Sequence, residues 1–249
     1  IPLPEEGTDY DFHGTHVAGI IASEKNNGVG VVGVAPNVKI MALRFNFNVS
    51  TAVQAIDFAR ENGAKIINAS YSGTASSTAE IDAIKRFTDA GGIFITAAAN
   101  AGRNNDDVSN TMHQFPSDYE LDGIISVAST DQNDELSGFS NFGNKSVDVG
   151  APGSKILSTG LDNDYFYLDG TSMSAPHAVG VASLIWGYNP ELTSSQVKTI
   201  LLGSGKNIRT LENKTVTGKR IDALGALSVF KPEILNFSFA TTTEGLVKV

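Results

Sequence analysis

The stretch that decides the fold runs from Lys65 to Ala98 and is KIINASYSGTASSTAEIDAIKRFTDAGGIFITAA. It opens with a short apolar run, KIINASY, which predicts a buried strand. Ile81, Ile84 and Phe87 then recur at helical spacing, so a helix that ends at a pair of glycines is predicted. The run IFITAA predicts the next strand, and the order strand, helix, strand indicates a βαβ unit with parallel strands.

The same alternation continues on both sides of this stretch. A preceding helix is predicted, with Ser50 or Thr51 as its cap and Asn62-Gly63 as its end, and GIISVAS at 123–129 predicts a further strand. The apolar segment 171–188 predicts a buried helix that opens with Thr-Ser. Strands interleaved with helices in this way predict an α/β fold built on a parallel sheet, whose functional groups gather at the carboxyl ends of the strands.

Composition excludes several classes of protein. The chain has 249 residues, 41% of them hydrophobic and 18% charged, which suits one large domain or a domain with a short appendage. Its net charge of -9 argues against nucleic acid as a partner. The absence of cysteine excludes cysteine peptidases, disulfide scaffolds and thiolate metal sites. No apolar run approaches the roughly 20 residues that a membrane span needs.

The last 19 residues differ from the rest. We predict one domain over residues 1–230, whose last element lies at 218–227. Residues 231–249 are β-prone and unlike what precedes them, so they are predicted to be a linker or the start of a C-terminal module.

Three segments combine residues that carry chemistry. They are HGTHVAG at 13–19, AAANAG at 97–102 and GTSMSAPH at 170–177. Acyl transfer by serine needs a hydroxyl activated by an imidazole and N–H donors for the oxyanion. Ser172, at the start of a predicted helix, is the candidate nucleophile; His13, ahead of a small-residue helix start, is the candidate base; Asn100, just past a strand, is a candidate oxyanion donor.

Each of these residues also has an ordinary structural explanation. A single histidine usually lies on the surface or in the core, as we expect for His113 and His177. Asn-Ala-Gly after a strand is usually a turn, and Ser-x-Ser at a helix start is usually a cap. All three segments in this order on a parallel α/β pattern are rare by chance, so the catalytic interpretation is favoured.

The three segments resemble the His, oxyanion Asn and Ser motifs of the subtilase family of serine peptidases. NNGVGVVGVAP, IINASYSG, SGFSNFG and VGAPG extend the similarity, which covers residues 12–228. The resemblance implies a three-layer parallel sheet with helices on both faces. It also implies that His13 is the general base, His16 a structural residue, Ser172 the nucleophile and Asn100 a donor to the oxyanion.

The resemblance further implies where a peptide binds. Ser70, Tyr71 and Ser72 are similar to the strand that pairs with the substrate backbone. Phe115-Pro116 resembles the family's cis-proline dipeptide. The side chain before the scissile bond is expected to enter a pocket with these walls: Ala97, Ala98, Ala99 and Gln114.

The acid of the triad does not follow the family pattern. In subtilases it ends a core strand thirty or more residues before the histidine, whereas only twelve residues precede His13 here. Asp9 and Asp11 are expected in the loop leading into His13, not as its partner. The chain is therefore interpreted as a catalytic domain that lacks its N-terminal strand, with the Asp supplied by an upstream segment or a second polypeptide.

The family pattern also predicts a metal and a location. The loop NNGVGV at 26–31 resembles the calcium loop of subtilases, so Asn27 is a candidate ligand of a structural Ca²⁺, and none is required for the chemistry. Secretion or display at the cell surface, and an inhibitory propeptide, are expected by resemblance alone.

Three functions compete. The first is a serine endopeptidase acting through an acyl-enzyme. The second is a catalytically incomplete fragment or pseudopeptidase that binds peptides or partners. The third, an esterase or lipase, would require Gly-x-Ser-x-Gly, which is not the sequence around Ser172.

Overall fold

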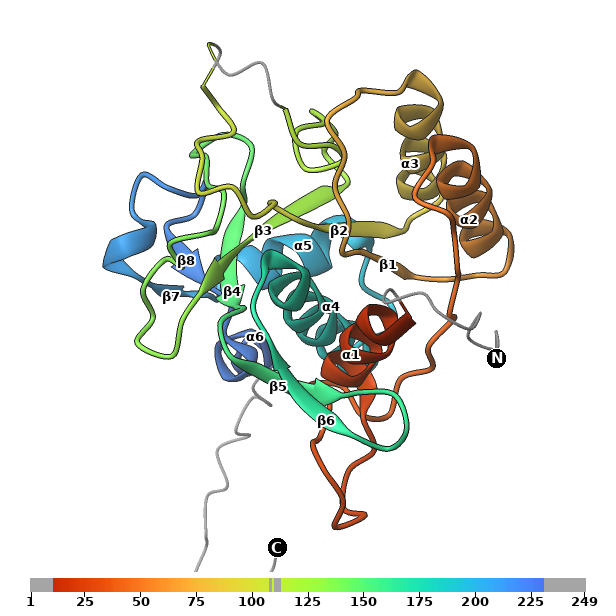
Figure 1. Cartoon of the computed structure of the whole chain (residues 1–249), viewed down its shortest axis with the longest axis vertical. Coiled ribbons are helices and arrows are strands. Elements are labelled where there is room, and N and C mark those ends of the chain that lie inside the picture. The colour runs from red at the N-terminus through yellow and green to blue at the C-terminus, as the bar shows by residue number, and fades with distance from the viewer. Residues whose placement is uncertain (1–10, 108, 110–112, 231–249) are drawn as a thin grey trace, which may run out of the picture.

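The computed structural model of the chain describes residues 11–107, 109 and 113–230 (Figure 1). Its main sheet has six strands in the order β1-β2-β3-β4-β8-β7. The first four pair in parallel, β8 pairs in parallel with β4, and β7 is antiparallel to β8. The strands are β1 (Ile66–Ala69), β2 (Ile93–Ala97), β3 (Ile124–Thr130), β4 (Val149–Pro152), β7 (Lys206–Asn207) and β8 (Lys219–Arg220).

Helices cover both faces of this sheet (Figure 1). One face packs against α2 (Val49–Glu61) and α3 (Thr78–Asp89). The other packs against α4 (Thr171–Tyr188), α5 (Ser194–Gly203) and α6 (Ala223–Ser228). A further helix, α1 (Asp11–Ala22), lies beside α4 and the antiparallel hairpin of β5 (Ile156–Thr159) and β6 (Tyr165–Leu168). A 3₁₀ turn, η1 (Arg209–Leu211), follows β7. The predicted α/β class and the parallel sheet are confirmed.

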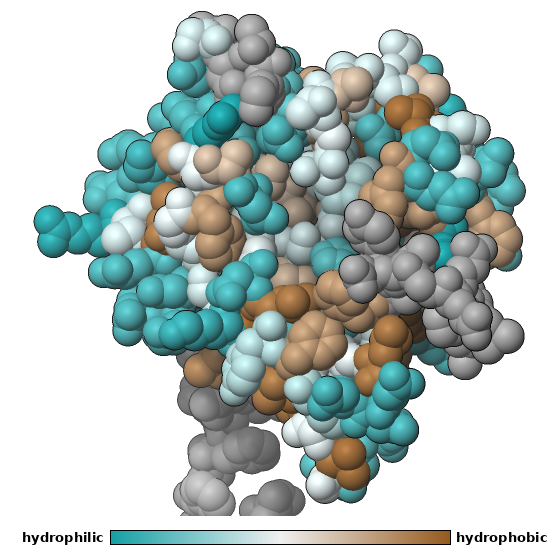
Figure 2. Space-filling view, viewed as in Figure 1, coloured by the Kyte–Doolittle hydropathy of each residue, from teal (hydrophilic) through white to brown (hydrophobic). Residues whose placement is uncertain are grey.

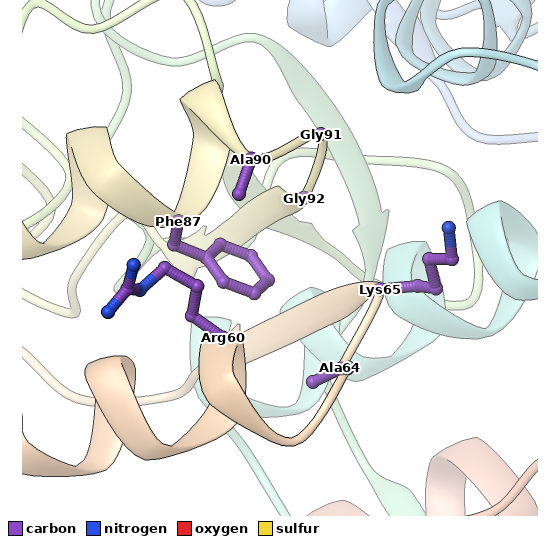
Figure 3. A pocket seen from close by; sticks show the side chains of 8 residues that line it. Arg60, Ala64, Lys65, Phe87, Ala90, Gly91 and Gly92 are labelled. Carbon is purple, nitrogen blue, oxygen red and sulfur yellow. The ribbon is translucent and has the colours of Figure 1, made fainter.

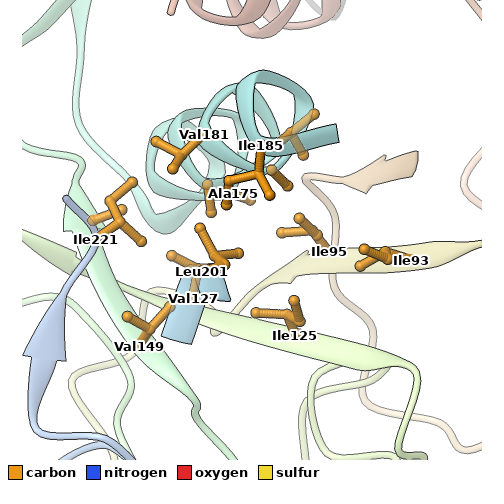
Figure 4. Packing of buried hydrophobic residues seen from close by; sticks show 14 of the residues in the cluster. Ile93, Ile95, Ile125, Val127, Val149, Ala175, Val181, Ile185, Leu201 and Ile221 are labelled. Atoms are coloured by element: carbon orange, nitrogen blue, oxygen red, sulfur yellow. The ribbon is translucent and has the colours of Figure 1, made fainter. Parts of the chain in front are cut away.

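The alternation of side chains along β2 explains the three layers. Ile93, Ile95 and Ala97 join the core under α4, whereas Phe94 joins the core under α3. Every residue of β2 is buried, as expected for a strand covered on both faces. Figure 4 shows these isoleucines facing Ile185 of α4. The sheet, α1, α5 and α6 surround α4, which explains why this helix is apolar on nearly all sides.

Several helix boundaries differ from those predicted. The cap of α2 is Asn48 rather than Ser50 or Thr51: its Oδ1 accepts from the backbone N of Thr51 at 2.9 Å, and the helix begins at Val49. The segment 218–227 divides into β8 and the start of α6. Residues 231–249 lie outside the described residues. None of the helices in the described ranges is long and apolar enough to cross a membrane.

A second difference concerns α1. It begins at Asp11, so His13 lies in its first turn and not ahead of the helix. Asp11 therefore belongs to the helix rather than to a loop, and Asp9 lies outside the described residues.

Figure 2 shows apolar residues gathered over α1 and the β5–β6 hairpin, in the lower half of the view.

Within the described part of the chain, β1 is an edge strand. Residues 39–46, which precede α2, form no regular structure and make no strand pair there. Ile40 and Met41 in this stretch are 45% and 39% exposed. An unpaired edge of a parallel sheet is a position that one more strand could fill.

Candidate active site

Ser172 is the second residue of α4 and is hydrogen-bonded to Ser70, which directly follows β1. Its Oγ donates to the backbone O of Ser70 at 3.4 Å. In return, the Ser70 Oγ donates to the backbone O of Ser172 at 2.8 Å. The side chain of Asn68, within β1, donates from Nδ2 to the Ser70 Oγ at 2.9 Å. These contacts fix the first turn of α4 against the carboxyl end of a strand.

Asn100 follows the end of β2, and its amide is oriented by the residue before Ser172. Its Oδ1 accepts from both the backbone N and the Oγ1 of Thr171, each at 2.9 Å. Because the backbone N of Thr171 can only donate, the oxygen of the Asn100 amide must be the atom that faces it. The Nδ2 group is consequently the free donor of this side chain.

Two N–H donors converge on the space beside Gly170. A Cβ placed on Gly170 would lie 3.6 Å from the Nδ2 of Asn100 and 3.6 Å from the backbone N of Ser172. Gly170 also has a φ of 155°, which residues with a side chain rarely adopt. The Asn100 Oδ1 lies at 3.8 Å from the same point but is already occupied by Thr171. Both N–H groups therefore border one space, as an oxyanion site for a tetrahedral acyl intermediate requires.

His13 lies in the first turn of α1, the helix that packs against α4. Burial lowers its pKa, and the nearby His16 lowers the pKa further. Among the side chains that the structure describes, which do not include that of Asp11, no carboxylate forms a hydrogen bond or an ion pair with His13. The imidazole is therefore neutral near pH 7 and able to accept a proton, but nothing described orients its ring or stabilises its charged form.

His16 and His177 have structural contacts. His16 is fully buried, and its Nε2 lies 3.1 Å from the backbone O of both Ile156 and Phe166. Because both partners are acceptors, Nε2 carries the proton and links α1 to the β5–β6 hairpin. The Nδ1 of His177 likewise donates to the backbone O of Met173 at 2.8 Å. Burial lowers the pKa of both histidines.

Because the pKa values of His16 and His177 are lowered by burial, we expect the fold to lose stability in mild acid. Their pKa values lie below 6.5 when folded and return near it when unfolded, so the unfolded chain binds more protons below pH 6.5 and stability falls as the pH falls. Thermal unfolding from pH 7 to pH 5 should show Tm falling by about 2–4 °C per kcal/mol lost. His177→Gln should flatten this slope. An unchanged slope in His177→Gln would contradict the explanation.

The predicted substrate-binding residues fall into two groups. Ser70, Tyr71 and Ser72 follow β1, and the next residue, Gly73, exchanges two backbone hydrogen bonds of 2.8 Å with Phe115. This bridge brings Gln114 to the same edge as Ser70. Phe115-Pro116 is cis, as the resemblance implied.

Ala97, Ala98 and Ala99 form the second group, at the end of β2. All three are buried, with exposed fractions of 3%, 0% and 4%. Ala99 has a φ of 83°, a conformation that favours glycine, immediately before Asn100. The turn after β2 is therefore strained where it presents the Asn100 side chain.

One positioning residue, Asn68, was not identified from the sequence; its side chain supports Ser70. The Thr171 hydroxyl donates to the Asn100 Oδ1 and helps to orient that amide. The one available signal for Asn68 was a polar residue inside an otherwise apolar strand.

Two hollows lie at opposite ends of the strands. The one in Figure 3 is lined by Arg60, Lys65 and Phe87 and lies at the amino ends of β1 and β2, away from Ser172. The other adjoins the residues after β1 and includes Tyr71 and Phe115. Only the second borders the edge where the candidate site lies.

Asn27, the candidate calcium ligand, lies in an exposed turn. Its Oδ1 accepts from the backbone N of Val29 at 3.0 Å. Within the described ranges, no group of three or more His, Cys, Asp or Glu side chains could hold a metal.

Comparisons with known proteins agree with this geometry. The family model for Peptidase_S8, the subtilase family, matches residues 3–219. Subtilisin DY of Bacillus licheniformis is 37% identical over 206 residues, covering 81% of this chain and 73% of its own length. Thermitase of Thermoactinomyces vulgaris is 43% identical over 178 residues, covering 70% of this chain and 60% of its own length.

A solved structure extends the likeness to the fold. It belongs to the proteases from Pseudoalteromonas arctica PAMC 21717 and superposes with a TM-score of 0.77 at 30% identity. The superposition covers 87% of this chain and 70% of that one. The chain is a member of the subtilase family of serine peptidases.

Proposed function

We propose that this chain is the catalytic domain of a serine endopeptidase, with Ser172 as nucleophile, His13 as general base and Asn100 as oxyanion donor. The observation that carries the proposal is the convergence of the Asn100 Nδ2 and the Ser172 backbone N on one space beside Gly170. Two N–H donors that border one space beside the residue of the proposed nucleophile are what acyl transfer requires.

The proposed reaction has two halves. His13 accepts the proton of the Ser172 hydroxyl as Oγ attacks the peptide carbonyl carbon, and the carbonyl oxygen becomes an oxyanion held by the two N–H donors. His13 then returns the proton to the leaving amine as the C–N bond breaks, which leaves an acyl-serine. Water, deprotonated by His13, attacks the acyl group and releases the acid and the free serine.

We further propose that the triad acid comes from a segment outside the described residues, which adds a strand to the free edge of β1. The support is the edge of β1, which is unpaired in the described part of the chain, together with the exposed Ile40 and Met41 in a stretch without regular structure. No carboxylate among the described side chains contacts His13 either. A carboxylate there would fix the His13 tautomer and raise its pKa. The alternative function, a peptide-binding relative without turnover, requires that no such acid is supplied.

The proposed path of the peptide substrate runs along the residues that follow β1. An extended peptide would pair with the backbone of Ser70, Tyr71 and Ser72, and the side chain before the scissile bond would lie between Ala97–Ala99 and Gln114. An amide at position 114 makes this pocket shorter or more polar than an alanine or glycine would. Secretion and an inhibitory propeptide remain proposals based on the family.

A structural calcium ion is also proposed, at the loop that contains Asn27. The Asn27 Oδ1 accepts one hydrogen bond and keeps a second lone pair, so it fits an oxygen-rich site as one ligand. The other ligands would be backbone carbonyls or groups from outside the described residues. Thermal unfolding with calcium and with a chelator tests this separately from activity.

Labelling with a fluorophosphonate tests the proposed function. Intact-mass measurement of the 249-residue chain should show one adduct, because the probe reacts with an activated serine beside an oxyanion site. The mass of the untreated sample reports whether another polypeptide accompanies the chain. No adduct on a folded sample would favour the peptide-binding alternative.

The Ser70 hydroxyl should set the rate of this labelling. Ser70→Ala removes the donor to the Ser172 carbonyl and the acceptor of Asn68, so the first turn of α4 should loosen. We expect labelling about tenfold slower and unfolding easier by about 1 kcal/mol. The control is Ser228→Ala, whose exposed hydroxyl also donates to a backbone oxygen, that of Leu224 at 2.7 Å. Equal rates in the two variants would refute a positioning role for Ser70.

A further inference from the structure

A hollow of about 90 Å³ beside the end of β1 combines aromatic walls with a carboxylate. Phe45, Tyr71 and Phe115 line it, and the rings of Phe45 and Tyr71 meet edge to face with centroids 4.9 Å apart. Glu80, from the first turn of α3, also lines it. None of the described residues that line the hollow is basic.

Glu80 is a buried carboxylate that has no described cation beside it. Its residue is 5% exposed. Tyr71 donates from its hydroxyl to Oε1 at 3.0 Å, and Tyr119 donates to Oε2 at 2.8 Å. Burial, and then the charge and hydrogen bond of Glu80, raise the pKa of Tyr71, and burial with the Glu80 hydrogen bond raises the pKa of Tyr119 to about 12. Both hydroxyls therefore stay protonated and hold the carboxylate in place.

Two neutral donors do not balance a buried negative charge. Carboxylates are rarely buried without a cation, because desolvation is costly unless an opposite charge replaces the water. Each oxygen of Glu80 keeps a lone pair beyond the one that its tyrosine uses. The hollow thus offers an unmatched negative charge with acceptor capacity left.

The lining of the hollow includes one exposed aromatic residue with a strained backbone. Phe47 lines it, is 65% exposed and has a φ of 51°, which is costly for a residue with a large side chain. Its ring centroid lies 5.0 Å from that of Phe45. Aromatic faces around a negative charge favour a cation with an apolar stem.

We propose that this hollow binds a basic side chain, lysine or arginine, of the peptide that lies along Ser70–Gly73. The apolar stem would pack between the rings of Phe45 and Phe115, and the cation would reach Glu80. The inference deepens the proposed function and rests on it for the path of the peptide, because Tyr71 follows the residue that contacts Ser172. It assigns a preference for substrates that carry a positive charge near the cleaved bond.

Peptide binding tests the preference without relying on turnover. The protein is the 249-residue chain with Ser172→Ala, and the probes are acetylated, amidated five-residue alanine peptides that end in phenylalanine. One of their first four positions carries lysine or the uncharged isostere norleucine. Titration by NMR up to millimolar peptide should show lysine bound about tenfold more tightly than norleucine at one position.

Variants assign that preference to the hollow. Glu80→Gln keeps the size of the side chain and should reduce the lysine preference to near onefold. Asp82→Asn removes the same charge from an exposed position on the same helix and should keep the preference. If Glu80→Gln fails to fold, Phe45→Leu, which removes an aromatic wall, should still weaken lysine binding several-fold while norleucine binding changes little.

The outcomes separate this inference from the proposed function. Equal binding of lysine and norleucine, equal effects of Glu80→Gln and Asp82→Asn, or no binding of any peptide would overturn the inference. Fluorophosphonate labelling without a lysine preference would leave the peptidase proposal standing. A lysine preference in a chain that takes up no probe would support the hollow and count against catalysis.

Discussion

Ser172→Ala is expected to take up no fluorophosphonate and to lower peptide turnover by one of two amounts. In a form of the protein that contains the triad acid, the loss should be about 10⁶-fold. In the 249-residue chain without an acid it should be only about 10²-fold. The measurement is kcat with a chromogenic peptide, made on the wild-type chain and on the variant.

The difference between the two amounts follows from the way a triad acts as a unit. Loss of the acid alone costs about 10⁴-fold in turnover, because the histidine loses its tautomer and the stabilisation of its charged form. Once the acid is lost, removing the serine costs only the small remaining rate enhancement that exceeds the one supplied by the oxyanion site and substrate binding alone. The size of the Ser172→Ala effect therefore reports whether His13 has a carboxylate partner.

Ser174→Ala is the matched control, two residues further along the same helix. Ser174 is fully buried, and its hydroxyl has no hydrogen-bond partner among the described residues, so its loss should change neither folding nor labelling. An adduct that persists in Ser172→Ala but disappears in Ser174→Ala would show that Ser174, and not Ser172, is the nucleophile. Turnover unchanged in both variants would mean that the activity belongs to a contaminant.

The elements of the fold could be predicted because their signals are local. The spacing of Ile81, Ile84 and Phe87 predicted α3, which spans Thr78–Asp89 and is capped by Ser77. The start of α2 was wrong because Ser50 and Thr51 compete with Asn48 as caps. The hydrogen bond from Thr51 to Asn48 that decides between them depends on backbone conformation.

The site was predicted as a set of residues but not as an arrangement. Motif spacing pointed to Asn100 and Ser172, yet the orientation of the Asn100 amide depends on Thr171, which is 71 residues away. His13 was placed ahead of its helix because glycine and threonine follow it, whereas packing against α4 and β5 extends α1 back to Asp11. Long-range partners decide both points, and a single sequence carries no signal for them.

The burial of polar residues was the feature that the sequence predicted least well. Glu80 looks from its sequence like an ordinary acidic residue in the first turn of a helix. Its burial depends on Tyr71 and Tyr119, of which the second lies 39 residues away. Hydrogen-bond networks between distant segments are therefore visible only in the folded chain.

Gly170→Ala is expected to lower turnover and labelling about 10³-fold while the chain still folds. The added methyl group would lie 3.6 Å from the Asn100 Nδ2 and from the Ser172 backbone N, in the space proposed for the oxyanion. Loss of one oxyanion donor typically costs 10²–10³-fold, and the methyl group keeps the oxygen away from two. The rate of labelling and kcat for a peptide measure the effect, with Tm as the check on folding.

The control must separate lost oxyanion binding from backbone strain. Gly218→Ala does so, because Gly218 has a φ of 63° and its added methyl group would meet nothing closer than 3.6 Å. It lies next to β8, so it should lower Tm by an amount similar to Gly170→Ala and leave labelling unchanged. If both variants label at the wild-type rate, the space beside Gly170 is not the oxyanion site. If both label equally slowly, strain explains the effect, whereas slow labelling of Gly170→Ala alone would mean that the two converging donors carry the chemistry.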